Sequence, residues 1–286
     1  MAGEKMREAV AAQPEWLARV PTVRRLPAGR VVHVGAGTSF HAAQTGGFAL
    51  QSLEAVLRPP EADAMVLVSH EGETTLTLEA AQAFSGPKWL VTGKPEGPIA
   101  ELCDEVVVCT PAIEQSWCHT ASYTCAVAAI AALHGEDVSA LPPRVAKVLA
   151  GERFPVTAHE RFAIVGAGHD WPTAQEAALK LREGVFVAAE AWETEQLLHG
   201  PLAAVDESVR CFVLEGEGRA ADRARGAVTA LETLGCDVVL VPTEHPVVDV
   251  VRFQLLTLDL AEARGVDPDL IRRDNERWKR AAAAHA

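Results

Sequence analysis

The sequence predicts an α/β protein built from two tandem, doubly wound (flavodoxin-like) parallel sheets. The segments Arg30–Thr38 and Arg161–His169 each contain a short apolar run that ends in Gly-Ala-Gly. They lie 131 residues apart (161 − 30), close to half of the 286-residue chain. Such an internal repeat indicates two copies of one module. The other apolar runs are continuous rather than alternating, which is typical of parallel strands buried on both faces. Helix-like segments separate these runs.

The first half contains strand and helix candidates in alternation. Continuous apolar runs predict strands at Ala64–Ser69, Lys88–Thr92 and Glu105–Thr110. Helices are expected at Thr75–Phe84, Ile99–Cys103 and the alanine-rich segment Ser122–Leu133. We expect residues 1–28 to form an N-terminal helical segment and residues 29–145 to form the first domain.

The second half repeats this pattern, and residues 146–286 are expected to form a second domain with a C-terminal tail. Strands are predicted at Val209–Leu214 and Asp237–Val241. Helices are predicted at Ala220–Leu234 and Phe253–Arg264, and each is followed by a glycine, a frequent residue at helix ends. Open parallel sheets bind ligands beyond the carboxyl ends of their strands, where both Gly-Ala-Gly turns are expected to lie.

The composition argues against several classes of protein. The chain has 26 Lys and Arg residues against 39 Asp and Glu, a net charge of −13, and no basic run, so no nucleic-acid partner is expected. The longest apolar stretch, Cys125–Leu133, is too short to span a membrane. The six cysteines form no C-x-x-C pair, and no secretory apolar core follows Met1. We therefore expect reduced thiols, no structural metal and a cytoplasmic location.

The turn at Gly35–Phe40 (Gly-Ala-Gly-Thr-Ser-Phe) is a candidate anion site rather than a dinucleotide site. Phe40 replaces the third glycine of a dinucleotide fingerprint, Trp171 replaces it in the second copy, and no clear acidic residue closes a following strand. A helix that opens with small residues and the hydroxyls of Thr38 and Ser39 can bind an anion. These hydroxyls could also do no more than cap the helix.

A second turn strengthens the anion-site interpretation. Ser69–Thr75 (Ser-His-Glu-Gly-Glu-Thr-Thr) follows an expected buried strand and again places hydroxyls and a glycine before a helix. Because the carboxyl ends of neighbouring parallel strands meet at one edge of a sheet, the two turns can converge on one anion. A phosphate is the typical anion at such a place.

Four segments resemble the sugar isomerase (SIS) domain family, in particular the double-SIS isomerase half of glucosamine-6-phosphate synthase and its stand-alone relatives. Gly35–Ser39 resembles the family's first phosphate loop, and Ser69–Thr74 resembles its Ser-Gln-Ser-Gly-Glu-Thr loop. Ala177–Glu183 (Ala-Ala-Leu-Lys-Leu-Arg-Glu) resembles its catalytic helix, and Glu195–Leu202 resembles its Glu-Leu-Lys-His-Gly-Pro segment. The similarity covers nearly the whole chain.

The resemblance implies a site for a small sugar or sugar phosphate, with no cofactor. It implies three catalytic residues: Glu183 as the base that moves a proton between C1 and C2, Lys180 beside the reacting carbons, and His199, which assists ring opening from a neighbouring subunit. A homodimer with shared active sites follows from that implied role. The implied substrate-binding residues are Gly37, Thr38, Ser39, Ser69, His70, Glu71, Thr74 and Glu176.

Without the resemblance, the same residues have a plainer interpretation. Glu176, Lys180 and Glu183 are spaced i, i+4 and i+7 and share one helix face, a pattern most often found in a solvated salt-bridge stripe. His199 alone would more often cap a helix or form a structural hydrogen bond. The resemblance favours the catalytic interpretation, because aldose–ketose isomerisation needs a carboxylate base, a second acid/base group and a nearby cation.

Departures from the family pattern bear on the substrate. Glu71 stands where the family has a second phosphate-binding serine, and a carboxylate there repels a phosphate unless it turns away or pairs with a cation. It would instead attract an amino group. His119 and Ala121 replace the family's serine and lysine, and together with Trp117 they predict a bulkier, more aromatic pocket wall.

The C-terminal tail departs as well. In the synthase this tail carries a lysine that forms a Schiff base with the open-chain sugar. Here Glu276 occupies the corresponding position and Lys279 lies three residues away, so a Schiff-base role is not supported. Because Met1 and Ala2 provide no cysteine nucleophile, we expect no glutamine-dependent amination by this chain.

The leading hypothesis is a cytoplasmic aldose–ketose isomerase of a hexose or hexosamine phosphate. Two alternatives use the same proton transfer: an amino-sugar phosphate deaminase, and a deglycase that cleaves an amine–sugar adduct. The runner-up is a non-catalytic regulator that binds a sugar phosphate, although both Glu183 and His199 are present. The helix at Ser122–Leu133 is a candidate dimer interface, or else it packs within the chain.

Overall fold

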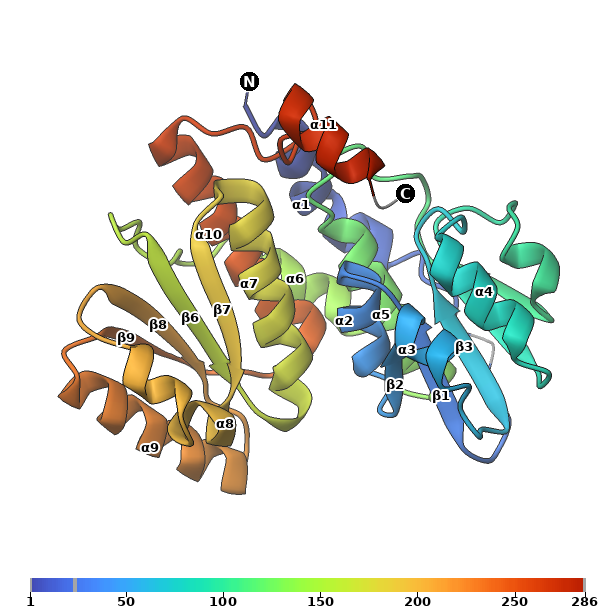
Figure 1. The fold of residues 1–286 in the computed structure, drawn as a ribbon, viewed down its shortest axis with the longest axis horizontal. Coiled ribbons are helices and arrows are strands. Elements are labelled where there is room, and N and C mark those ends of the chain that lie inside the picture. Colours follow the sequence, from blue (N-terminus) through green and yellow to red (C-terminus); the bar gives the residue numbers. More distant parts are fainter. Residues whose placement is uncertain (1, 23–24, 285–286) are drawn as a thin grey trace.

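Two parallel β-sheets lie on either side of a central layer of helices (Figure 1). The computed structural model describes residues 2–22 and 25–284. The first sheet has five strands in the order β2-β1-β3-β4-β5, and the second has four in the order β7-β6-β8-β9. The first order is the flavodoxin-like one, and the second is the same order with one strand fewer. The predicted fold class is confirmed.

The first sheet forms from the continuous apolar runs of the first half. In β3, every residue is buried, as expected for a strand with helices on both faces. Pairing Val31 with Ala64 brings the carboxyl ends of β1 and β3 together at one edge. The strands are β1 (Val31–Gly35), β2 (Ala49–Gln51), β3 (Ala64–Val68), β4 (Lys88–Thr92) and β5 (Glu105–Val108), and the connecting helices are α2 (Thr38–Gln44), α3 (Ser52–Leu57), α4 (Thr75–Ala83) and the 3-10 turn η1 (Ala100–Leu102).

The second sheet repeats this arrangement. Its innermost strands, β6 and β8, are almost entirely buried and pair in parallel from Arg161, opposite Val209. The strands are β6 (Arg161–Gly166), β7 (Ala188–Glu193), β8 (Val209–Leu214) and β9 (Asp237–Val241). The helical elements are η2 (Gly168–Asp170), α7 (Trp171–Val185), α8 (Thr194–Leu198), η3 (Pro201–Ala204) and α9 (Arg219–Thr233).

The central layer contains α1 (Glu4–Leu17), α5 (Ala121–Leu133), α6 (Leu141–Leu149) and α10 (Pro246–Arg264) (Figure 1). Within this layer, α2 of the first half contacts α7 of the second. All residues of α5 are buried within this one chain. Its alanines allow α1, α2 and α10 to pack closely around it. Of the two roles considered for this helix, packing inside the chain is therefore correct, and a surface interface is not.

Helix α10 joins the two halves. Residues of its first turns, among them Val247 and Val251, belong to the same apolar core as α1 and α5, whereas Phe253 and Leu256 belong to the core beneath the second sheet. The expected boundary between residues 145 and 146 lies inside α6, and the division into sequence ranges stays a prediction.

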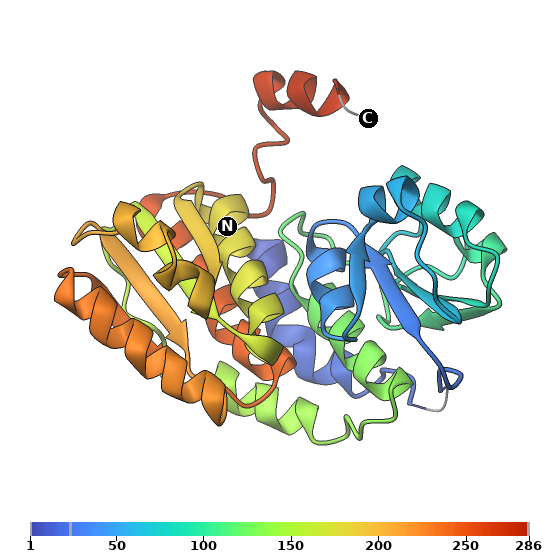
Figure 2. The same ribbon diagram turned by 60° about the horizontal axis from the view of Figure 1, so that its bottom comes forward.

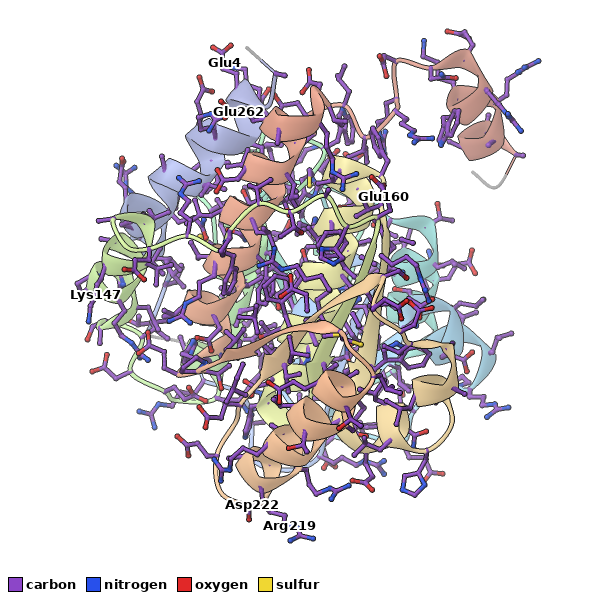
Figure 3. The ribbon with its side chains drawn as sticks, turned by 90° about the vertical axis from the view of Figure 1, so that its left-hand side faces the viewer. Glu4, Lys147, Glu160, Arg219, Asp222 and Glu262 are labelled. Carbon is purple, nitrogen blue, oxygen red and sulfur yellow. The ribbon has the colours of Figure 1, made fainter. Side chains whose placement is uncertain are left out.

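The N-terminal and C-terminal regions are joined by hydrogen bonds. The backbone N–H of Gly3 donates to Asp267 Oδ1 at 3.0 Å, and that of Met6 donates to Asp269 Oδ1 at 2.7 Å. Figure 3 shows Glu4 and Glu262 at the same end of the molecule, where α1 lies beside the end of α10. These contacts hold the segment after α10 against α1.

The last helix, α11 (Glu276–Ala283), stands away from the body and has no buried residue (Figure 2). Within the described residues, no helix combines the length and apolar character needed to cross a membrane. The six cysteines are all unpaired, and only Cys103 is not buried.

Candidate active site

The candidate site lies at the switch point of the first sheet, where the connections from β1 and β3 run in opposite directions. The Gly-Ala-Gly turn needs its glycines here. A Cβ on Gly35 would come within 2.6 Å of the Ser39 carbonyl group, and Gly37 has φ of 56°. Only glycine adopts such a backbone without strain. The tight turn directs Thr38 toward α7 of the second half.

A buried charge cluster connects the two halves at this point. Lys180 Nζ lies 2.7 Å from Glu183 Oε2 and 3.3 Å from Glu176 Oε1, and it donates a hydrogen bond to Thr38 Oγ1 at 3.3 Å. The side chains of Lys180 and Glu176 are fully buried, whereas that of Glu183 is 26% exposed. Glu183 is therefore the acidic group of the cluster that solvent and a small molecule can reach.

Glu176 is held as an anion by its neighbours. Its carboxylate accepts hydrogen bonds from His41 Nδ1 at 2.7 Å and from Thr38 Oγ1 at 3.2 Å. Burial alone would raise the pKa of Glu176, but Lys180 and then His41 outweigh it, and the pKa lies below its ordinary value.

Lys180 remains an ammonium in the same environment. Burial opposes its charge, but Glu176 and Glu183 together raise the pKa of Lys180 well above its ordinary range. The interpretation of this helix face as a solvated stripe is therefore wrong for Glu176 and Lys180. Full burial separates the ammonium from solvent, and its contacts include Glu183 and Thr38.

A pocket at the strand ends opens beside Thr38. Its polar lining combines hydroxyl and imidazole groups from four segments: Thr38, Ser39, His70, Thr92, His119, Ser122 and Tyr123. The rings of His70 and His119 meet edge to face at 5.2 Å. The expected aromatic wall is thus present at His119. By contrast, Trp117 is 40% exposed and stacks on Arg273 of the tail, 3.6 Å from the ring centre.

Both imidazoles of this pocket are neutral near pH 7. Burial, followed by the nearby His119, lowers the pKa of His70 to about 4, and burial also lowers the pKa of His119. The backbone N–H of Glu114 donates to His70 Nε2 at 3.1 Å, so this nitrogen carries no proton and Nδ1 does.

Two further polar groups shape the pocket. The Glu114 carboxylate accepts hydrogen bonds from the backbone and hydroxyl groups of Thr120 and Ser122, all between 2.7 and 2.8 Å, and so anchors the start of α5. The hydroxyl of Tyr123 is buried and has no hydrogen-bond partner among residues 2–22 and 25–284. Because buried hydroxyls are nearly always satisfied, this group is available to a ligand or a water molecule.

The second turn lies at the rim of the pocket. The hydroxyls of Ser69 and Thr74 are 3.3 Å apart and share a hydrogen bond. Glu71 is exposed and is not part of the pocket lining. The nearby Lys94 bonds to Glu73 at 2.6 Å, and this hydrogen bond, more than the charge of Glu71, raises the pKa of Lys94.

His199 lies apart from this group. It follows α8, its side chain is 70% exposed, and its Nε2 lies 2.9 Å from Glu195 Oε1. Among the hydrogen bonds of residues 2–22 and 25–284, none joins His199 to the cluster on α7. A single copy of the chain therefore brings Thr38, Glu176, Lys180 and Glu183 together and leaves His199 at the surface.

The chain is similar in sequence to curated proteins of one kind. No protein-family model matches the chain. The glutamine–fructose-6-phosphate aminotransferase (isomerizing) of Thermus thermophilus is 30% identical over 305 residues, which cover 84% of this chain and 50% of that protein. The corresponding protein of Aeropyrum pernix is 30% identical over 307 residues, which cover 85% and 50%. The chain thus spans about half the length of the curated relatives it matches.

Several solved structures have the same fold as this chain over nearly its whole length. The C-terminal domain of glucosamine-fructose-6-phosphate aminotransferase from Francisella tularensis superposes with a TM-score of 0.77 at 19% identity, covering 93% of this chain and 98% of that one. A glucosamine-6-phosphate deaminase from Thermotoga maritima gives 0.76 at 21% identity, with coverages of 93% and 97%. Tagatose-6-phosphate ketose/aldose isomerase from Escherichia coli gives 0.76 at 16% identity, covering 94% and 95%.

The chain has the double-SIS fold. It is a homologue of the isomerase half of the aminotransferases, as the motifs at Gly35–Ser39 and Ala177–Glu183 indicated. The roles of individual residues in this double-SIS chain stay predictions.

His41 and Tyr123 are among the residues of the site that were not predicted from the sequence. His41 bonds to Glu176, and the Tyr123 hydroxyl is free in the pocket. The position of His41, three residues after Thr38 on one helix, is a signal that could have placed it beside the same partner. No comparable signal pointed to Tyr123, because an aromatic residue in an apolar helix ordinarily belongs to the core.

Proposed function

We propose that this chain is a sugar-phosphate aldose–ketose isomerase in which Glu183 moves a proton between C1 and C2 of an open-chain hexose or hexosamine phosphate. One observation carries the proposal: Glu183 is the partly exposed carboxylate of an otherwise buried cluster, held at 2.7 Å by the ammonium of Lys180. A base must meet its substrate at a defined position, and this contact provides one.

The neighbouring residues support this chemistry. Lys180 holds Glu183 and keeps a positive charge near the site, which favours the negative charge that develops on the enediolate oxygens. The hydroxyl of Ser39, with whichever of the Ser69 and Thr74 hydroxyls accepts their shared hydrogen bond, is a donor for the anionic end of the substrate. Thr38, whose hydroxyl donates to Glu176, lines the same pocket. The neutral imidazole of His70 and the free hydroxyl of Tyr123 can bind sugar hydroxyls without adding charge.

Isotope exchange tests the proposal. The wild type is incubated in deuterated water with fructose 6-phosphate, glucosamine 6-phosphate or tagatose 6-phosphate, and proton NMR follows exchange at C1 and C2. We expect exchange with at least one of them, and we expect Glu183→Gln to abolish exchange while retaining ligand-induced thermal stabilisation. Glu232→Gln, at an exposed carboxylate of α9, is the matched control. Undiminished exchange in Glu183→Gln would remove the mechanism.

A second candidate, release of an amine from an amino-sugar phosphate or an amine–sugar adduct, is favoured by Glu71. Its exposed carboxylate at the rim disfavours an anion and attracts an ammonium group. Ammonia release from glucosamine 6-phosphate by the wild type, reduced in Glu71→Gln, would favour the deaminase. Stabilisation by a ligand without any exchange would favour a regulator that only binds sugar phosphates.

The exposed position of His199 supports a homodimer with shared sites, because among the described residues the ring is bonded to Glu195 and not to the α7 cluster of its own chain. Sedimentation at the assay concentration tests this, and an active monomer would contradict it. The unpaired cysteines support a reducing compartment, the cytoplasm.

A further inference from the structure

The histidine of the proposed mechanism, His199, belongs to a series of three surface side chains linked by hydrogen bonds. His199 Nε2 lies 2.9 Å from Glu195 Oε1, one helical turn earlier. Glu195 in turn accepts two hydrogen bonds from Arg223 of α9, from Nε to Oε2 at 2.7 Å and from a terminal nitrogen to Oε1 at 3.2 Å. This two-point contact fixes the plane of the carboxylate.

The chain of contacts determines which nitrogen of His199 carries a proton. Hydrogen bonds from Arg223, and then from His199, lower the pKa of Glu195, so its carboxylate is ionised and can only accept. Nε2 of His199 must therefore donate. A neutral ring then has its lone pair on Nδ1, on the other side of the ring from Glu195.

A purely structural role explains the arrangement poorly. The side chains of His199, Glu195 and Arg223 are 70%, 45% and 39% exposed. Ion pairs at such exposure contribute little to stability, so little is gained by holding three long side chains in one geometry. A defined imidazole orientation is what the arrangement provides.

We propose that Glu195 and Arg223 are positioning residues that hold His199 as the Nε2–H tautomer, with Nδ1 as the nitrogen that exchanges a proton with the substrate. The inference rests on the proposed function. In ring opening, Nδ1 accepts the proton of the anomeric hydroxyl as the bond between C1 and the ring oxygen breaks. The imidazolium then returns that proton to the ring oxygen, so the step consumes no net proton.

Helix α9 offers a matched control for this pair. Arg225 lies two residues from Arg223 and bonds to Asp222 and Glu215 instead. Figure 3 shows Asp222 and Arg219 at the exposed outer side of α9. Replacing Arg225 therefore changes the net charge of the helix as Arg223→Ala does, without touching the Glu195–His199 contact.

The first test reads the tautomer directly. Nitrogen NMR of the imidazole rings, assigned with a His199→Gln variant, distinguishes Nε2–H from Nδ1–H in the full-length protein without substrate. We expect Nε2–H in the wild type and in Arg225→Ala, and a mixture of tautomers in Glu195→Gln and Arg223→Ala. An unchanged tautomer in Glu195→Gln, or an equal effect of Arg225→Ala, would overturn the inference.

The second test reads catalysis on whichever sugar phosphate the wild type turns over. General acid–base groups contribute about 100- to 10,000-fold, and we expect loss of orientation to lower kcat by about tenfold with little change in KM. Arg223→Lys keeps the charge but loses the two-point geometry, so it should fall between Arg223→Ala and the wild type. If no sugar phosphate is turned over, the proposed function fails, while the tautomer measurement still decides the role of Glu195 and Arg223.

Discussion

Replacing Lys180 with methionine removes the cation at the centre of the buried charge cluster. The ammonium lies 3.3 Å from Glu176 Oε1 and 2.7 Å from Glu183 Oε2, and Lys180 and Glu176 are fully buried. Removing one partner of a buried ion pair typically costs about 3–5 kcal/mol, because the other charge stays buried without compensation. We expect the free energy of unfolding to fall by that amount and Tm to fall by roughly 10 °C.

The pH dependence of this loss follows from Glu176. In the wild type, burial raises its pKa but Lys180 and His41 lower it more, so its contribution to stability is present at neutral pH. That contribution is lost as the pH falls through the depressed folded-state value. In Lys180→Met, the ammonium that did most to lower the pKa of Glu176 is absent, so burial dominates and the folded-state pKa of Glu176 rises. Stability is then recovered in acid and lost as the pH rises, so the deficit should shrink from pH 7 toward about pH 4.

Urea denaturation of three variants measures these effects. Lys180→Met is compared with the double variant Glu176→Gln/Lys180→Met, which leaves no unpaired buried charge from this pair and should recover much of the loss. Lys279→Met is the control, because Lys279 pairs with Glu276 in an exposed contact worth about 1 kcal/mol or less. A loss below about 1 kcal/mol for Lys180→Met, or a loss that does not change with pH, would refute the reasoning.

Two further predictions concern the strand-end turns. The pKa of His70, about 4 in the folded protein, lies below the unfolded value near 6.5, so it gives stability that is present above pH 6.5 and lost as the pH falls toward 4. His70→Gln should therefore reduce the acid loss of stability by up to about 3 kcal/mol, and equal pH slopes in urea denaturation would contradict this. Gly37→Ala should destabilise by about 1–3 kcal/mol because of its φ of 56°. Gly226→Ala, inside α9, should stabilise by about 0.5–1 kcal/mol, and the same sign for both would count against the strain argument.

Much of the fold was predictable because continuous apolar runs are strong signals. The predicted bounds of β4, β8 and β9 are those of the structure, α4 and α5 differ by one residue at one end, and α9 is shifted by one residue at both ends. The edge strands β2 and β7 were missed. Strand β2 has only three residues, and β7, Ala-Ala-Glu-Ala-Trp-Glu, consists mostly of residues that are poor in strands.

The beginning of α10 shows where local signals mislead. The helix was predicted from Phe253 but begins at Pro246. The intervening residues, Val-Val-Asp-Val-Val after the proline, are rich in β-branched side chains, which favour strands. Packing against α5, α6 and α7 overrides that preference, because the segment is buried on all sides.

The candidate site was predictable in its chemistry but not in its burial. The spacing of Glu176, Lys180 and Glu183 places them on one helix face, and Lys180 contacts both carboxylates. Whether that face is solvated depends on which element covers it. The element is α2, which comes from the other half and brings Thr38 and His41. Helical periodicity contains no information about a partner more than 130 residues away.

The shared use of α10 has a consequence for synthesis of the protein. Val247 and Val251 complete the apolar core around α1 and α5, although they follow the second sheet in the chain. A nascent polypeptide emerging from the ribosome therefore holds the whole first sheet long before its supporting interior is filled. We expect the first half to stay incompletely packed and dependent on chaperones until α10 has been translated.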